Sequence, residues 1–192
     1  MKEHLQDFIH KRVASPDETE IQAILQAFNE VTYNKGDLFK KQDTRIEHLG
    51  FLVSGSARSY FIKDNGEEIS FDIHQEICFL SDIISVRSNK ESPVIIEFLE
   101  KSNVLAADME NVWMLLGKNI TFNILIREYM GDRAMELLKM HHMFLNGTAK
   151  ERYRYVLETN PSLLQKYPLR FIASIIGVTP TQLSRIRKDL DW

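Results

Sequence analysis

Between residues 15 and 29 the hydrophobic and polar positions alternate with the period of a helix. The apolar residues recur every three or four positions, at Ile21, Ile24, Leu25 and Phe28. Such spacing is typical of a helix that buries one face. The preceding run Ser15-Pro16-Asp17-Glu18 combines a capping serine, a proline for the first helical position and acids for the first turn. We therefore predict that residues 1–29 are helical and that one helix starts after Ser15.

Residues 30–108 follow a different pattern, in which short apolar runs alternate with turn signals. Turn-forming residues gather at 34–37, 54–56, 64–66 and 101–103. Two β-rich runs, 59–62 and 68–73, flank Asn65-Gly66, which is a strong hairpin signal. Many short strands separated by turns favour a β-sandwich or a cupin-like jelly roll over a parallel sheet.

Helical spacing returns in residues 109–146, where two apolar stripes run along one helix. The first stripe is Ile126, Met130, Ala134, Leu137, His141 and Phe144, and the second is Gly131, Met135, Leu138, His142 and Leu145. A helix with two apolar faces must bury both. We predict that one face covers the β-roll and that the other pairs with a second copy, through a parallel seam of Met135, Leu138, His142 and Leu145. The alternative is a helix buried within one chain.

Asn146-Gly147 breaks this helix, and a new one follows directly. Thr148 and Glu151 have the spacing of a capping box, and Asn160-Pro161 ends the new helix. Residues 146–148 are thus a candidate hinge. The predicted parts are an effector-binding-like β-roll domain at 1–118, a long dimerisation helix at 119–146 and a DNA-binding domain at 147–192.

Residues 169–188 meet the requirements of a helix-turn-helix. Ala173 is small where the two helices approach, and Gly177 suits the left-handed residue that ends the first helix. Val178 is the apolar residue of the turn. Thr179 and Gln182 form a second capping-box pattern around a proline at the first helical position. Four apolar side chains are predicted to face the helix–helix contact: Ile172, Ile176, Leu183 and Ile186.

The opposite face of the second helix is polar and carries no acid, which suits the major groove of DNA. The candidate DNA-binding residues are Thr179, Pro180, Thr181, Gln182, Ser184, Arg185, Arg187 and Lys188. We expect Thr179 and nearby amides to hold a phosphate, and Arg185 to read a guanine edge. Thr181 and Gln182 lie near base edges, whereas Ser184, Arg187 and Lys188 are expected at the DNA backbone.

The charge distribution agrees with a polyanionic partner for the C-terminal quarter. Of the 24 Lys and Arg and the 27 Asp and Glu, residues 149–192 hold 8 bases and 4 acids, a balance of +4. Residues 1–148 hold the other 16 bases and 23 acids, a balance of −7. A basic segment on an acidic body favours nucleic-acid binding by that segment.

Composition argues against several other classes. No apolar run approaches the roughly 20 residues that cross a bilayer, and the N-terminus has no signal-peptide pattern, so we expect a cytoplasmic protein without membrane association. The single Cys78 cannot form an intrachain disulfide or hold an iron–sulfur cluster. The β-region offers only His48 and His74, without the His-x-His of a cupin-type metalloenzyme. We expect neither catalytic residues, nor a metal site, nor a cofactor.

Together these elements resemble the CRP/FNR family of regulators over nearly the whole chain. Lys35-Gly36-Asp37 and the run 49–58 are similar to the family's strand–glycine–strand pattern, and the helix-turn-helix matches closely. The resemblance implies an α+β fold: an N-terminal cyclic-nucleotide-binding-like β-roll with flanking helices, a long dimerisation helix and a C-terminal winged-helix-like helix-turn-helix. By position, Pro180, Thr181 and Arg185 correspond to the family's base-reading residues, and only Arg185 keeps the side chain of the cAMP-binding members.

The effector site departs from the family's pattern. The resemblance assigns the ribose hydroxyl to Glu76 and the cyclic phosphate to an arginine beside Ser92, but that arginine is missing here. Glu91 places negative charge near the phosphate position instead, and Arg87 or Lys90 would have to substitute. The candidate effector pocket is therefore Glu76, Arg87 and Ser92, and we expect no tight cAMP binding.

The resulting prediction is a sequence-specific DNA-binding transcription regulator of the CRP/FNR type that does not respond to cAMP. Its expected partners are double-stranded DNA and a second copy of the chain, with RNA polymerase as a further candidate. The alternative is an effector-sensing or adaptor protein that keeps the cyclic-nucleotide-binding-like domain and has lost DNA binding. A ligand in the roll would shift the long helices, and the hinge would turn the recognition helices toward half-sites about 34 Å apart.

Overall fold

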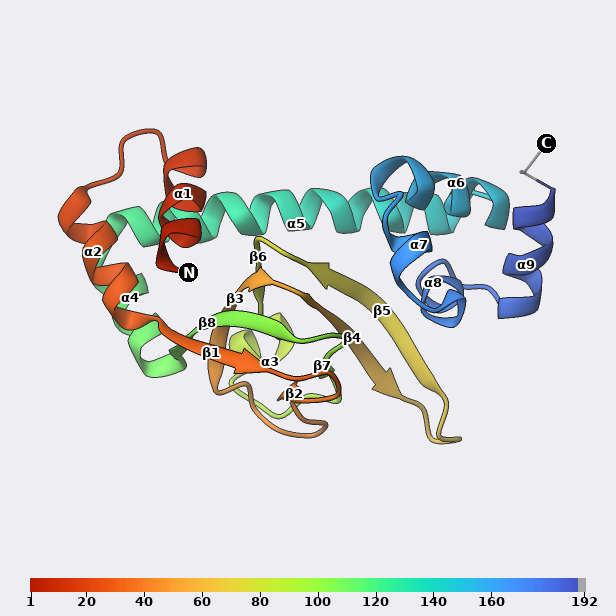
Figure 1. Cartoon of the computed structure of the whole chain (residues 1–192), viewed down its shortest axis with the longest axis horizontal. Coiled ribbons are helices and arrows are strands. Elements are labelled where there is room, and N and C mark those ends of the chain that lie inside the picture. The colour runs from red at the N-terminus through yellow and green to blue at the C-terminus, as the bar shows by residue number, and fades with distance from the viewer. Residues whose placement is uncertain (190–192) are drawn as a thin grey trace. The chain divides into compact units, whose positions relative to one another are not determined.

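The computed structural model describes residues 1–189, and its chain mixes α-helices with two antiparallel sheets (Figure 1). It divides into two compact units. The first unit contains residues 1–61 and 73–131, and the second contains residues 62–72 and 132–192. The last three residues of the predicted DNA-binding domain, 190–192, lie outside the described residues. The predicted boundaries at 118 and 146 stay predictions.

Two helices open the first unit, α1 (Lys2–Arg12) and α2 (Glu18–Ala27). The predicted start of the second helix is wrong by two positions, because Asp17 and not Ser15 is its cap. The Asp17 carboxylate accepts the backbone N–H of Glu20 at 2.9 Å. Ser and Asp are comparable caps, so composition alone did not separate them. The apolar positions Ile21, Ile24 and Leu25 are buried, as their spacing predicts.

Eight short strands follow, and they form two four-stranded sheets. In chain order they are β1 (Asn29–Tyr33), β2 (Leu38–Lys40), β3 (His48–Ser54), β4 (Ser56–Ile62), β5 (Glu68–Gln75), β6 (Cys78–Leu80), β7 (Ile95–Phe98) and β8 (Ser102–Asp108). One sheet has the order β1-β8-β3-β6 and the other β2-β7-β4-β5. The hairpin predicted at Asn65-Gly66 joins β4 to β5, and Gly66 has φ +83°.

A short helix that the sequence did not predict, α3 (Ile83–Ser88), interrupts the β-region. Asp82 caps it by accepting the amides of Ile84 and Ser85, and Asn89 ends it in a left-handed conformation with φ +51°. A six-residue helix has too few turns to show a periodic apolar pattern, so its sequence was not distinguishable from a loop between strands.

Strand β3 lies at the centre of the packing because both of its faces are buried. On one face Phe51 packs edge-on against Phe8 of α1, with ring centroids 5.1 Å apart. On the other face Leu52 belongs to a cluster between the sheets that also contains Leu80 and Phe98. Side chains therefore fill the space between the two sheets in this part of the roll.

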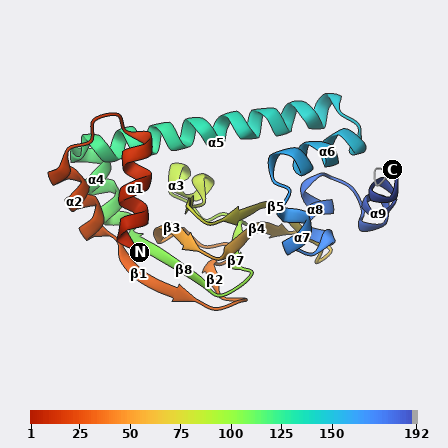
Figure 2. The same cartoon turned by 45° about the horizontal axis from the view of Figure 1, so that its top comes forward.

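Two helices close the first unit and lead out of it, α4 (Met109–Lys118) and α5 (Ile120–Asn146). Figure 2 shows α1, α2 and α4 gathered at the first turns of α5. Asn119 separates the two helices and caps α5 by accepting the amide of Phe122 at 2.7 Å. The Glu20 carboxylate accepts the next two free amides, those of Ile120 at 2.9 Å and Thr121 at 2.8 Å. A hydrogen bond from the Thr121 side chain, together with these two backbone hydrogen bonds, lowers the pKa of Glu20.

The first turns of α5 are packed on the core of the first unit. Phe122 and Leu125 are fully buried, and the Tyr129 ring lies 5.1 Å from that of Phe79. This packing face is formed by Phe122, Leu125 and Tyr129, and Ile126 of the predicted first stripe also lies against this core. The apolar spacing was correctly recognised as helical, but periodicity does not say which turns meet the sheet.

The second unit begins within α5 and adds four shorter helices, α6 (Ala149–Thr159), α7 (Leu163–Lys166), α8 (Leu169–Ile175) and α9 (Pro180–Lys188). The predicted capping box is present, with the Thr148 hydroxyl and the Glu151 carboxylate each accepting the other residue's amide. The hairpin residues 62–72 belong to this unit, and the Ser174 hydroxyl donates to the carbonyl of Ser70 at 2.8 Å. Within the described residues after 108 there is no strand, so no β wing accompanies these helices up to residue 189.

Candidate nucleic-acid interface and effector pocket

Helices α8 and α9 form the predicted helix-turn-helix. Ala173 is fully buried where the helices meet, together with Ile172, Ile176 and Leu183. Gly177 follows α8 with φ +70°, a conformation that side chains with a Cβ adopt only with strain. A Cβ at this glycine would lie 2.7 Å from the Phe144 ring, so the turn has no space for a larger residue.

The capping box of α9 is complete. The Thr179 hydroxyl accepts the amide of Gln182 at 3.2 Å, and the Gln182 side-chain carbonyl accepts the amide of Thr179 at 2.9 Å. Both side chains are thus partly committed to the start of the helix. Pro180 has no N–H, which leaves Thr181 as the first-turn residue whose amide no described hydrogen bond uses.

The outward face of α9 has the composition that the sequence predicts. Among the described residues, the fully exposed positions of this helix are Pro180, Thr181, Gln182, Ser184, Arg185 and Lys188. Arg187 and Ile186 are half-buried, as is Val178 in the turn. Neither face of α9 carries an acid between residues 180 and 188. The helix therefore presents donors and cations to solvent and keeps Leu183 inside.

The candidate seam residues are also exposed. Met135 is 55%, Leu138 62% and Leu145 69% accessible, which is unusual for large apolar side chains on one helix. Met135, Leu138 and His142 line a groove of about 330 Å³, together with Lys139, Met143 and Tyr155 of α6. Leu137 on the other stripe is equally exposed at 62%. The second half of α5 thus exposes several large apolar side chains within the described part of the second unit.

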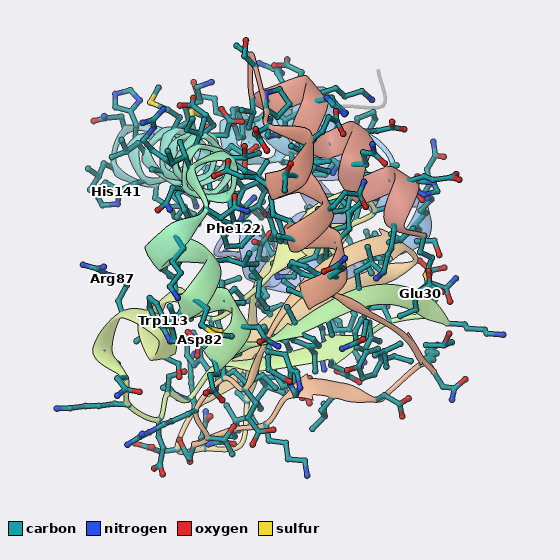
Figure 3. The ribbon with its side chains drawn as sticks, turned by 90° about the vertical axis from the view of Figure 1, so that its left-hand side faces the viewer. Glu30, Asp82, Arg87, Trp113, Phe122 and His141 are labelled. Carbon is teal, nitrogen blue, oxygen red and sulfur yellow. The ribbon has the colours of Figure 1, made fainter. Side chains whose placement is uncertain are left out.

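The candidate effector residues lie in different surroundings. Glu76 and Arg87 are exposed, whereas Ser92 is buried. Figure 3 shows Arg87 projecting outward from α3, away from Asp82. The Ser92 hydroxyl donates to the Asp82 carboxylate, so the hydroxyl is already used by the protein itself.

Ser92 lies beside a buried ion pair that the sequence did not predict. Lys40 Nζ lies 3.3 Å from Asp82 Oδ2, and the two side chains are 1% and 2% accessible. The same ammonium donates to the carbonyls of Ser92 at 3.1 Å and Val94 at 2.7 Å. Lys40, Asp82 and Ser92 lie on separate segments of the chain, so their spacing carried no signal that could have linked them.

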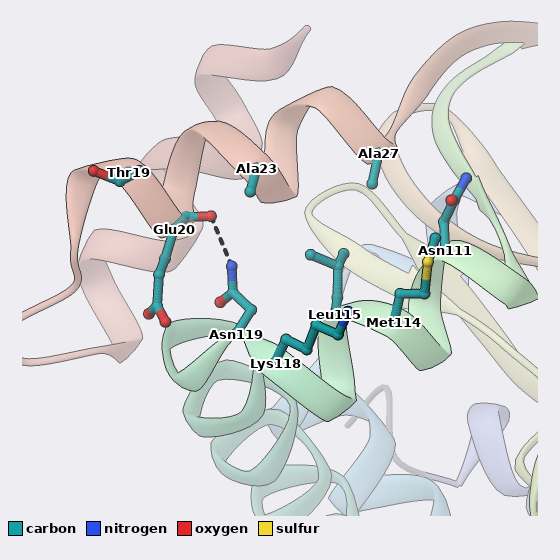
Figure 4. A pocket seen from close by; sticks show the side chains of 9 residues that line it. All are labelled: Thr19, Glu20, Ala23, Ala27, Asn111, Met114, Leu115, Lys118 and Asn119. Carbon is teal, nitrogen blue, oxygen red and sulfur yellow. Dashed lines mark hydrogen bonds between the residues drawn. The ribbon is translucent and has the colours of Figure 1, made fainter.

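A second groove lies between α2 and α4, away from these three residues (Figure 4). It has a volume of about 410 Å³ and is lined by Ala23, Ala27 and Leu115, with Lys118 and Asn111 at its rim. The Asn119 side chain donates to the carbonyl of Glu20 across its end. The sequence did not mark this groove.

Other chemistry is limited among residues 1–189. No group of three or more His, Cys, Asp and Glu side chains in this range could hold a metal ion. His141 and His142 are both exposed. Cys78 is half-buried and donates to the carbonyl of Gln75. No helix in the same range is long and apolar enough to span a bilayer.

Comparison with solved structures confirms the fold that the sequence resemblance implied. The chain is similar to the c-di-GMP-responsive global regulator CLP of Xanthomonas campestris, with a TM-score of 0.71 and 14% identity over 91% of this chain and 92% of that one. It is also similar to FixK2 from Bradyrhizobium japonicum, with a TM-score of 0.67 and 20% identity over 85% of this chain and 84% of that one. For the catabolite activator protein of Thermus thermophilus the TM-score is 0.56, with 18% identity over 91% and 84%.

These neighbours are regulators of the CRP/FNR family, and the architecture of the described chain is theirs. No protein-family model and no curated protein sequence matches the chain. At identities of 14–20% the likeness establishes the α+β fold with its long helix.

Proposed function

We propose that the chain is a homodimeric, sequence-specific DNA-binding transcription regulator of the CRP/FNR type. The observation that carries this proposal is the exposed face of α9, which offers Thr181, Ser184, Arg185 and Lys188 on a helix whose apolar side is buried against α8. A major groove about 12 Å wide admits such a helix, and cations attract it to the phosphates.

The capping box refines the contacts that we propose for α9. Because the Gln182 side-chain carbonyl accepts hydrogen bonds from both the amide and the hydroxyl of Thr179, its two lone pairs are used and the side chain is left with N–H donors. Two-point recognition of adenine needs a donor and an acceptor on the same amide, so Gln182 suits an acceptor on a base or a phosphate. Arg185 is not used in the cap and has the fork geometry for a guanine edge. Thr179 acts by holding the helix start near a phosphate, and Arg187 and Lys188 contact the DNA backbone.

The proposed dimer follows from the exposed second half of α5. Met135, Leu138, His142 and Leu145 recur at intervals of three, four and three residues, the spacing of a coiled-coil seam. Pairing with the same helix of a second copy would remove these apolar side chains from water and place two α9 helices on one duplex. RNA polymerase remains a candidate further partner.

We also propose that the roll does not take cAMP. A cyclic phosphate needs a cation and donors, but here Ser92 already donates to Asp82 and Lys40 is paired with the same carboxylate. Uncovering these groups would leave a buried charge without its partner, which is costly. Isothermal titration calorimetry with cAMP should show no heat of binding, and micromolar affinity would overturn this part of the proposal.

Selection from a library of random duplexes tests the main proposal. The protein should enrich one inverted repeat, and Arg185→Ala should weaken binding to it by about 1–3 kcal/mol while relaxing selectivity at one base pair. Arg154→Ala, on the exposed side of α6, is the matched control and should leave the base preference unchanged. A protein that retains no duplex even at low salt would favour the adaptor alternative instead.

A further inference from the structure

One guanidinium joins the ends of two helices in the second unit. Arg152 of α6 donates from Nε to the carbonyl of Ile176 at 2.8 Å and from Nη1 to the carbonyl of Gly147 at 3.0 Å. Ile176 is the residue at which α8 ends, and Gly147 directly follows the last residue of α5. Arg152 is half-buried, so these bonds are partly shielded from water.

The carbonyls at a helix C-terminus are the groups that most favour such a contact. The last four carbonyls of a helix lack intrahelical partners and form the negative end of its dipole. Hydrogen bonds from a charged donor are stronger than neutral ones, and only the planar fork of arginine presents donors in two fixed directions. Arg152 can therefore hold two helix ends at a set separation. A shorter side chain, or one whose donors all lie on a single nitrogen atom, cannot do this.

Phe144 makes a second connection between the same elements. It lies in the last turn of α5, and its ring occupies the space beside Gly177, 2.7 Å from where a Cβ would be. The Arg152 guanidinium lies 5.0 Å from the centroid of this ring, within the range of a cation–π contact. Gly177 is in the turn that leads into α9, so Phe144 packs against the residue that aims the recognition helix.

We propose that Arg152 and Phe144 form a clamp that sets the angle of α9 relative to the end of α5, and thereby the spacing of the two half-sites that the dimer selects. This inference rests on the proposed function. The segment 146–148 is then not a free joint, because one of its carbonyls is held by Arg152. In a symmetric dimer the two α9 helices are connected through the two α5 helices. Conformational freedom at each clamp therefore widens the range of distances between the two α9 helices.

Binding to duplexes of varied spacing tests the clamp. The half-site enriched from the random library is placed in inverted repeats whose spacing changes one base pair at a time, and each duplex is titrated by fluorescence anisotropy. Wild type should prefer one spacing, and Arg152→Gln should lower that preference by about tenfold or more, since two charge-assisted bonds are lost. Affinity for a duplex with a single half-site should stay within about threefold, because α9 itself is unchanged.

Further variants show whether a change in spacing preference is due to the contacts of Arg152 and Phe144. Arg154→Gln removes the same charge from the same helix without a helix-end contact and should keep the wild-type spacing preference, even where it weakens all duplexes alike. Phe144→Leu should reduce the preference as Arg152→Gln does. If Arg152→Gln loses its helical circular dichroism, Arg152→Lys, which can serve one carbonyl, replaces it and should give an intermediate preference.

The outcomes separate the clamp from the function on which it rests. Wild-type spacing preference in the folded Arg152 variants would overturn the clamp and leave the DNA-binding proposal standing. A wild-type protein that binds no duplex would overturn both. Loss of single half-site affinity in Arg152→Gln, to the same extent as loss on the preferred repeat, would assign Arg152 a general structural role and also overturn the clamp.

Discussion

The candidate recognition helix α9 and the buried group of Lys40, Asp82 and Ser92 in the roll treat their polar side chains in opposite ways. On α9 the residues Ser184, Arg185 and Lys188 are exposed and face solvent. In the roll, Lys40, Asp82 and Ser92 are buried and bind one another. Polar side chains thus remain available to a partner on α9, whereas in the roll they are already paired with one another. A polar group is available to a partner only where the fold has not already satisfied it.

The largest effect is expected when one residue of the buried Lys40–Asp82 pair is replaced. Lys40→Met should destabilise the protein by about 3–5 kcal/mol, because Asp82 would be left charged and buried. Denaturant unfolding followed by circular dichroism measures the loss. Lys41→Met, at the exposed neighbouring position, is the control and should change the free energy of unfolding by less than about 0.5 kcal/mol. A loss no greater than that of the control would mean that the pair is not buried in solution.

The next largest effect is expected at the seam. Leu138→Glu places two carboxylates in the proposed dimer interface and should weaken the dimer by about 3–5 kcal/mol, because each charge loses water without gaining a partner. Sedimentation equilibrium measures the monomer–dimer constant, and Glu136→Gln serves as the exposed control on the same helix. An unchanged constant would show that this stripe is not the interface.

A smaller effect is expected in the turn before α9. Gly177→Ala should cost about 1–2 kcal/mol for the left-handed conformation, plus the clash with the Phe144 ring. Thermal unfolding measures the loss. The double variant with Phe144→Leu should recover the part due to the clash and keep the part due to φ. If the double variant is no better than the sum of the two single variants, the ring does not fill this space.

The smallest effect concerns pH and the carboxylates that cap helices. The Glu151 carboxylate accepts the amide of Thr148, and this hydrogen bond lowers its pKa below the ordinary value of 4.5. Because the pKa is depressed in the folded state, this contribution to stability is present above pH 4.5 and is lost as the pH falls through the folded pKa. The difference in stability between wild type and Glu151→Gln should therefore shrink on acidification. A difference that stays constant with pH would contradict the charged cap.

Local signals in the sequence predicted much of the fold and of the candidate interface. Capping boxes at Thr148 and Thr179, the left-handed Gly177 and the Asn65-Gly66 hairpin all form as predicted. Each depends on residues within four positions of one another. The helix after Ser15 was misplaced by two residues because two capping residues, Ser15 and Asp17, competed within three positions.

Long-range placement was less predictable. Periodicity identified apolar stripes along α5 but not that Phe122, Leu125 and Tyr129 in its first turns pack on the core of the first unit. The clamp at Arg152 joins residues 147 and 176, and the side chain that does this was indistinguishable from the other cations of the basic C-terminal segment. Nothing in the spacing of these residues marks the contact.

What the sequence by itself determined is the form of helix α9: where it begins, which side it buries and that its outer face is polar and free of acids. These properties follow from caps, glycine and proline conformations and apolar periodicity, all of which act over a few residues. Only the tertiary structure decided that Lys40 and Asp82 pair inside the roll and that Arg152 holds two helix ends. Such contacts form between segments that only folding brings together, and their energies depend on burial that no local pattern records.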